Sequence, residues 1–99
     1  VLSGGDGCVA GLSNFAPDVA SAYAAAARAD DLKKMEQCQQ QVDGLMAIYD
    51  VAPQFIPTIK KAMVLRGIEM EPVCAQPLLP ATEAETEEIR RILKEGNLI

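Results

Sequence analysis

The side chains that could do chemistry in this 99-residue sequence are lysines, carboxylates and cysteines, because it contains no histidine. Without an imidazole, these residues offer neither a histidine base nor a histidine metal ligand. The lysines all fall in helical patterns: Lys33, Lys34, Lys60, Lys61 and Lys94. A lysine nucleophile must lose its proton near neutral pH and is therefore held desolvated inside a site. Adjacent lysines on a helix are typical of a solvated face, so no catalytic residue is predicted here.

Neither a metal ion nor a cofactor is predicted. The acidic cluster at residues 83–88 lies where a helix begins, and the helix dipole explains it better than a divalent cation does. Three scattered cysteines (Cys8, Cys38 and Cys74) form no CxxC pair, which excludes a zinc knuckle and a thioredoxin-like motif. An odd set of thiols in a chain that is 49% hydrophobic is typical of reduced, buried cysteines in a cytoplasm. Cys8 is expected to be buried.

Charge and composition exclude two further classes of partner. The net charge of −5 disfavours a nucleic-acid surface, which needs clustered Lys and Arg. The apolar runs are far too short to span a membrane, and no signal peptide is recognisable. The sequence begins at Val1 rather than Met, which suggests a processed or partial polypeptide.

Caps, prolines and apolar periodicity predict four helices, at residues 17–28, 31–50, 57–67 and 82–96. Thr82 and Glu85 have the spacing of a capping box, and Gly96 is a natural stop. Prolines keep residues 68–80 extended. The second helix has an apolar stripe formed by Leu32, Met35, Val42, Leu45, Met46 and Tyr49.

The glycine-rich start leads into an apolar run at residues 8–10 and then to the polar pair Ser13-Asn14, which predicts a short buried strand over residues 4–14. A lone buried strand leaves its backbone donors and acceptors unsatisfied. Either this segment is a loop beside a helical bundle, or its partner strands belong to missing residues. The run is apolar on both faces, as in a parallel strand covered on each side, which favours missing residues.

Four motifs together resemble the dihydrodipicolinate synthase and N-acetylneuraminate lyase family. GGDG at 4–7, a strand ending in Ser13-Asn14 and FAP at 15–17 resemble its last barrel strand. RADD at 28–31 resembles its G-D step, with Ala29 where glycine is common. IKKAMVLRG at 59–67 and PLLP at 77–80 resemble its v-K-a-a-l-x-x-x-G helix and its P-l-x-P turn. The ending AGLSN at 10–14 is closer to the sugar-acid aldolases of the family than to its synthases.

The resemblance implies an α/β fold: the C-terminal portion of a (β/α)8 TIM barrel plus a helical C-terminal extension, so that the chain itself is mostly helical. Residues 1–30 would be the eighth strand and helix, and residues 31–99 the extension. Family members are class I aldolases and lyases that join pyruvate or another 2-keto acid to a lysine as a Schiff base. They then make or break a carbon–carbon bond with an aldehyde. The family places that lysine on its sixth strand, outside this chain, and a cytoplasmic homo-oligomer, commonly a tetramer, is implied.

Barrel enzymes build their sites at the carboxyl ends of the strands. The predicted site residues are therefore Gly11 and Ser13 as substrate contacts and Asn14 as a structural residue that fixes the following loop. In the alternative interpretation, Gly11 relieves crowding in the barrel and Ser13-Asn14 only closes a turn.

A second function is a free-standing four-helix binding or scaffold module without catalysis. The segment at residues 4–14 distinguishes the two, because such a module has no use for a strand. If that segment is solvent-exposed coil with no neighbouring backbone, the enzyme interpretation loses its physical basis.

Overall fold

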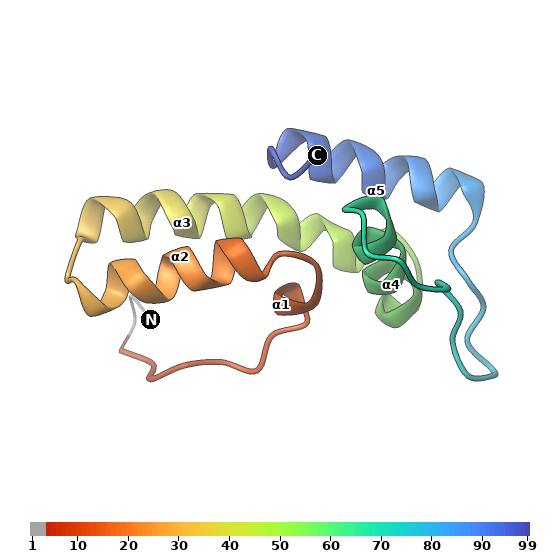
Figure 1. Ribbon diagram of the computed structural model, residues 1–99, viewed down its shortest axis with the longest axis horizontal. Coiled ribbons are helices and arrows are strands. Elements are labelled where there is room, and N and C mark those ends of the chain that lie inside the picture. The colour runs from red at the N-terminus through yellow and green to blue at the C-terminus, as the bar shows by residue number, and fades with distance from the viewer. Residues whose placement is uncertain (1–3) are drawn as a thin grey trace.

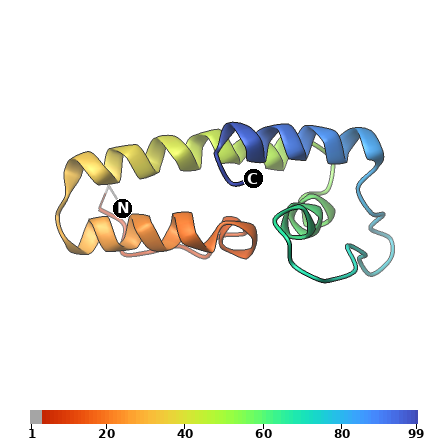
Figure 2. The same cartoon turned by 45° about the horizontal axis from the view of Figure 1, so that its top comes forward.

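The computed structural model describes residues 4–99, so the first three residues of the predicted barrel segment lie outside the described residues. The described part contains five α-helices and one 3-10 helix: α1 Leu12–Phe15, α2 Pro17–Arg28, α3 Leu32–Leu45, η1 Met46–Asp50, α4 Phe55–Leu65 and α5 Glu83–Glu95. Helices α2 and α3 lie side by side as an antiparallel hairpin (Figure 1), and the far end of α3 meets α4 and α5. The second view shows the same arrangement with α5 beside the end of α3 (Figure 2). The molecule is elongated, with extents of 42 × 24 × 24 Å.

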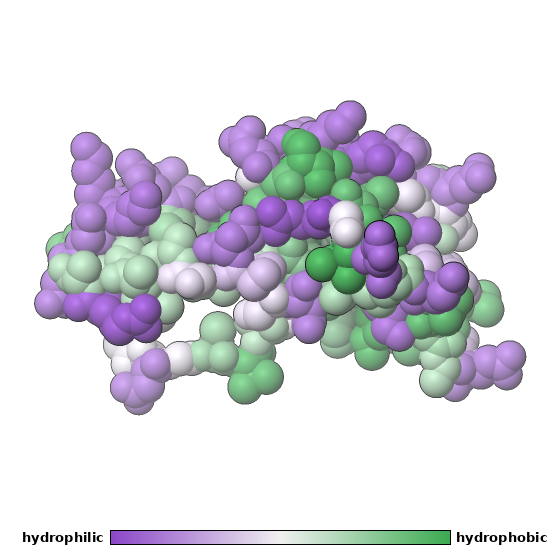
Figure 3. Space-filling view, viewed as in Figure 1, coloured by the Kyte–Doolittle hydropathy of each residue, from purple (hydrophilic) through white to green (hydrophobic). Residues whose placement is uncertain are grey.

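The predicted strand is not formed: residues 4–99 contain no β-strand. Residues 5–10 are extended coil without regular structure, and no backbone hydrogen bond joins residues 5–9 to another described residue. Val9 is fully exposed, and in the space-filling view this segment stands away from α2 (Figure 3). Cys8 is also exposed, so its predicted burial is wrong, while Cys38 is buried as expected. The missing strand and the exposure of Cys8 have the same physical reason: no described strand lies beside residues 5–10 to pair with them or cover them.

The four predicted helices are confirmed, and their starts follow the predicted signals. Pro17 occupies the first position of α2. The Asp31 side chain caps α3 by accepting from the Lys34 amide at 3.1 Å. Thr82 and Glu85 form the complete capping box of α5. Helix α4 begins at Phe55, two residues before the predicted Pro57, which fits because a proline within the first turn needs no amide donor.

Three helix ends share one hydrogen-bonded arrangement, in which a residue with positive φ turns the chain back on the last turn. That residue is Asp30 after α2, Gly67 after α4 and Asn97 after α5. At each end, two amides return to carbonyls of the last turn, as in Ile68 N to Met63 O (3.1 Å) and Leu98 N to Leu93 O (2.9 Å). Gly96 is thus the C-cap of α5, and Asn97 rather than glycine makes the left-handed turn.

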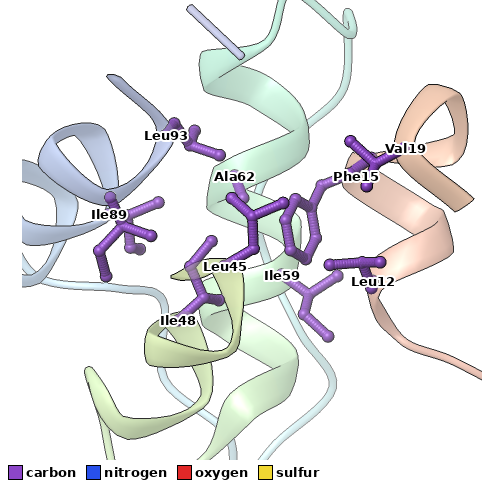
Figure 4. Packing of buried hydrophobic residues seen from close by; sticks show 11 residues of the cluster. Leu12, Phe15, Val19, Leu45, Ile48, Ile59, Ala62, Ile89 and Leu93 are labelled. Atoms are coloured by element: carbon purple, nitrogen blue, oxygen red, sulfur yellow. The ribbon is translucent and has the colours of Figure 1, made fainter. Parts of the chain in front are cut away.

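One apolar core joins α1, the end of α3, η1, α4 and α5 (Figure 4). At its centre, Phe15 from α1 lies against side chains of the later helices, including Leu45 and Ile59. The largest fully buried side chains are Phe15, Leu45, Ile48, Ile89, Leu93 and Thr58. The core therefore contains residues from both sides of position 30. The division of the chain at that position into a barrel end and a helical extension remains a prediction.

The stripe predicted for the second helix is only partly buried. Met35 and Leu45 are buried, whereas Leu32 is 71% exposed and Met46 is 39% exposed. Leu32 lies in the first turn of α3, beside the α2–α3 connection, and Met46 lies where the helix tightens to 3-10 geometry at η1. A change of helical period rotates the following side chains away from the original stripe.

Leu45→Ala is expected to lower the free energy of unfolding by about 2–5 kcal/mol, because it leaves a cavity at a position with no solvent exposure. Leu32→Ala is the matched control and should change it by less than about 0.5 kcal/mol, because Leu32 is mostly solvated. Urea unfolding of the two variants measures both values. Equal losses would contradict the assigned core.

Candidate functional site

The predicted site residues lie together on one short turn. Gly11 is the N-cap of α1, and Ser13 and Asn14 lie within this helix rather than in a loop after a strand. The Asn14 amide donates from Nδ2 to the Gly11 carbonyl at 3.2 Å, and the Ser13 amide donates to the Ala10 carbonyl at 3.2 Å. Both side chains are exposed. Asn14 thus stabilises the turn, and the Ser13 hydroxyl has no hydrogen-bond partner among residues 4–99.

Gly11 is packed against η1 and α4. A Cβ atom at this position would lie 2.5 Å from the Tyr49 hydroxyl oxygen and 2.8 Å from Ile59 Cδ1. At contacts this short the ends of Tyr49 and Ile59 would have to shift, so the absence of a side chain at Gly11 lets η1 and α4 lie close to this turn. The direction in which a side chain would point is therefore filled by protein. A substrate that contacts Gly11 would have to reach its backbone from another side.

Tyr49 and Ile59 are thus neighbours of the predicted site that the sequence did not identify. Tyr49 is half-buried, and its ring packs against Phe55 with centroids 5.7 Å apart. In the sequence it belongs to an apolar helical stripe, and nothing there indicates a contact with a residue 38 positions earlier. The glycine was the available signal, since a close approach is one of the two reasons for a glycine at the end of an apolar run.

An ion pair ties the next part of this corner to the end of α4. The Arg66 guanidinium donates to both carboxylate oxygens of Asp18, from Nη1 at 2.8 Å and from Nη2 at 3.1 Å. This pair lowers the pKa of Asp18, mainly through the hydrogen bond to Arg66, and burial opposes the shift. The same hydrogen bond raises the pKa of Arg66. The sequence did not predict this pair.

Comparison with known proteins shows what this chain is similar to. The family model described as the dihydrodipicolinate synthetase family matches residues 1–96. The chain belongs to this family. Its predicted resemblance is thereby confirmed.

Individual relatives of the family agree with this assignment. An uncharacterized DapA-like lyase of Thermococcus onnurineus is 36% identical over 96% of this chain and 32% of its own length. A probable 2-dehydro-3-deoxy-D-pentonate aldolase, YjhH, of Escherichia coli is 31% identical over 94% of this chain and 31% of its own length. A solved structure described as a monomeric dihydrodipicolinate synthase variant superposes with a TM-score of 0.84. It is 33% identical and covers 99% of this chain and 32% of its own.

The chain spans about one third of the length of the relatives it matches. The exposed coil at residues 5–10 therefore does not count against the family, although sequence analysis had made it the deciding feature. That criterion was wrong, because a strand needs its neighbours and the matched relatives contain twice as much chain again. The segment matches the dihydrodipicolinate synthetase family in its amino-acid sequence, although it forms no strand in the described residues.

The lysines of this family member occupy helix surfaces, as predicted. Lys60 is half-buried along its stem and donates from Nζ to the Val73 carbonyl at 2.6 Å, which fastens the extended segment at residues 68–80 to α4. Within residues 4–99, no three side chains of the metal-ligating types come together.

The acidic cluster at residues 83–88 lies on the first turns of α5, where it forms ion pairs with the arginines one turn later. Glu87 accepts from Arg90 at 3.3 Å, and Glu88 accepts from Arg91. Arg91 lowers the pKa of Glu88, chiefly through that hydrogen bond.

No helix in the described range is long and apolar enough to cross a bilayer.

Gly11→Ala is expected to destabilise the protein by about 1–3 kcal/mol, because the methyl group overlaps Tyr49 and Ile59. Gly44→Ala is the matched control: it lies inside α3 with no atom within 4 Å of the added carbon, so it should stabilise by up to about 1 kcal/mol. Thermal or urea unfolding measures both. A neutral Gly11→Ala would show that the turn does not pack on the extension.

Asp18→Asn should reveal a pH-dependent contribution to stability. Because the folded-state pKa of Asp18 is lowered below 3.8, the charged pair stabilises the protein above that pH and is lost as the pH falls through the folded-state value. Asp18 is 58% exposed, so the contribution should stay below about 1 kcal/mol. Unfolding free energies of both proteins should therefore differ at pH 6 and converge near pH 2. A difference that grows on acidification has the wrong sign.

Proposed function

We propose that this chain is the C-terminal part of a (β/α)8 barrel enzyme that forms a Schiff base with pyruvate or another 2-keto acid. The enzyme would make or cleave a carbon–carbon bond between that keto acid and an aldehyde. The observation that carries the proposal is the match of the dihydrodipicolinate synthetase family to nearly the whole chain. A relative named as a 2-dehydro-3-deoxy-D-pentonate aldolase supports a 2-keto-3-deoxy sugar acid as the substrate class.

The N-terminal segment fits the barrel part of this proposal. Residues 5–10 are extended and apolar around Val9, and the backbone groups of residues 5–9 make no hydrogen bond to another described residue. A parallel barrel strand needs a neighbour on each side and cover on each face. As the eighth strand, the segment would end at Gly11, and α1 and α2 would follow it as the start of the eighth helical layer.

The chemistry is divided between this chain and the rest of the enzyme. The lysine that forms the Schiff base would lie on the family's sixth strand, outside this chain. The lysines of this chain lie on helix surfaces and would not form it. Gly11 would present its backbone to the substrate, and the free Ser13 hydroxyl would hydrogen-bond a substrate hydroxyl. Asn14 would hold the turn through its bond to the Gly11 carbonyl. No cofactor is proposed, because the lysine supplies the electron sink.

Borohydride reduction with pyruvate tests the reaction class in the complete protein that carries this chain. Reduction of a Schiff base leaves a stable adduct, which mass spectrometry locates on a peptide. The adduct is expected on a lysine outside residues 1–99. An adduct on Lys60 or Lys61 would overturn the division of labour, and no adduct at all would remove the proposed reaction.

Ser13→Ala tests the substrate contact. With 2-dehydro-3-deoxy-D-pentonate as the probe, KM should rise about 3- to 10-fold while kcat changes little, because one hydrogen bond to the substrate is lost. Ser21→Ala on the exposed face of α2 is the matched control and should leave both constants unchanged. Equal constants for Ser13→Ala and the unchanged protein would leave Ser13 as a turn residue only.

The scaffold module is distinguished by the state of the N-terminal segment and by mass. An intact mass equal to this chain alone, in a folded monomer that binds no keto acid, would favour the module. In a complete barrel, Cys8 should be protected from thiol reagents although it is exposed in this chain. A homo-oligomer remains a prediction from the family, and one solved relative is described as monomeric.

A further inference from the structure

Arg66 contacts three segments that are distant in the sequence. Besides its two bonds to Asp18, it donates from Nη1 to the Phe15 carbonyl at 2.9 Å and from Nε to the Leu98 carbonyl at 3.3 Å. The Arg66 side chain is 22% exposed, so its bonds to the two carbonyls are partly buried, whereas the Asp18 carboxylate stays mostly solvated. Phe15 ends α1, Asp18 lies in the first turn of α2, and Leu98 follows α5.

The contacts use the particular geometry of an arginine at a helix end. Arg66 is the C-cap of α4, where a cation is favoured by the helix dipole. Gly67 follows with φ of 100°, and the chain turns away, so the side chain of Arg66 points back over the junction. The planar guanidinium offers five donors in a fixed fork and can serve a carboxylate and two carbonyls at once, whereas a lysine offers one charged point.

These bonds matter most for α1, because four residues make only a single helical turn. A turn of this length is not stable by itself, and its position depends on what holds it. Phe15 anchors it in the core, and Arg66 fixes its last carbonyl. Ser13 and Asn14 lie on the same turn, two residues and one residue, respectively, before Phe15, whose carbonyl Arg66 binds. If the bonds of Arg66 were removed, α1 could rotate, and any such rotation would displace the Ser13 hydroxyl.

We propose that Arg66 is a positioning residue for the substrate site: it holds the α1–α2 corner in the orientation that presents Ser13. The inference rests on the proposed function for its effect on the reaction, and on the contacts above for its effect on the corner. The helical extension then has a role in the site although none of its side chains touches the substrate. A displacement of about 1 Å at a binding group is enough to change rates or affinities substantially.

The experiment compares Arg66→Lys, Asp18→Asn and Arg90→Lys in the complete protein. Arg66→Lys keeps the charge and loses the fork, and Asp18→Asn weakens the corner without altering Arg66. Arg90→Lys is the matched control, because Arg90 pairs only with Glu87 on the exposed face of α5 among the described residues. Hydrogen exchange of peptides covering residues 11–19 and steady-state kinetics with 2-dehydro-3-deoxy-D-pentonate are measured for each.

Arg66→Lys should raise the exchange rate in residues 11–19 by about tenfold and leave exchange in α5 unchanged, because about 1.4 kcal/mol of local stability is lost. The KM of Arg66→Lys should rise as far as that of Ser13→Ala, and its kcat should stay within twofold of the unchanged protein. The double variant Arg66→Lys, Ser13→Ala should have the same KM as either single variant. Asp18→Asn should show the same pattern at smaller amplitude. A role in global stability alone would lower the active fraction, and with it kcat, and leave KM unchanged.

Unchanged exchange in residues 11–19 would overturn the inference whatever the kinetics show. Raised exchange with an unchanged KM, or additive effects of Arg66→Lys and Ser13→Ala, would also overturn it. Failure of the unchanged protein to trap pyruvate would count against the proposed function, and the exchange measurement would still decide whether Arg66 holds the corner.

Discussion

The structure depends on the burial of Phe15 among side chains that come from the middle of the chain. Phe15 follows an exposed coil and ends a single helical turn, yet it is 2% exposed because Leu45, Ile48 and Ile59 surround it. Full burial of an aromatic side chain contributes about 1.5–3 kcal/mol, which a four-residue helix cannot supply from its own hydrogen bonds. The turn that carries Phe15 is thus held by α3, η1 and α4.

Small structural details follow from that packing. Because Phe15 brings the turn against η1 and α4, Gly11 comes so close to Tyr49 that a side chain there would displace the Tyr49 hydroxyl. The same approach brings the Phe15 carbonyl and Asp18 within reach of Arg66. The apolar core, the glycine and the ion pair therefore depend on one another. A change at one of them should be felt at the turn that carries Ser13.

The helices could be predicted from local signals, and the contacts at the site could not. Pro17, Asp31 and the Thr82–Glu85 pair act within one turn of chain, so their effect is readable without the fold. Residues 4–14 suit a strand, but a strand is a property of two segments, and residues 4–99 contain no partner strand. The contacts of Gly11 with Tyr49 and of Arg66 with Asp18 join positions 38 and 48 residues apart. Nothing in a periodic pattern specifies such pairs. The family resemblance identified the turn at residues 11–14 but not the residues that pack against it.

The glycine-rich coil before α1 sets a thermodynamic requirement for anything that settles against it. Fixing the backbone of residues 5–10 in one conformation costs on the order of 10 kcal/mol in chain entropy, and glycines at positions 5 and 7 place the cost at the upper end. Hydrogen bonds with a single neighbour recover only part of this, at about 1 kcal/mol each. Ordering therefore requires close packing on several sides at once. Assembly of this stretch should consequently be an all-or-none event that comes late in folding, after the helices have formed.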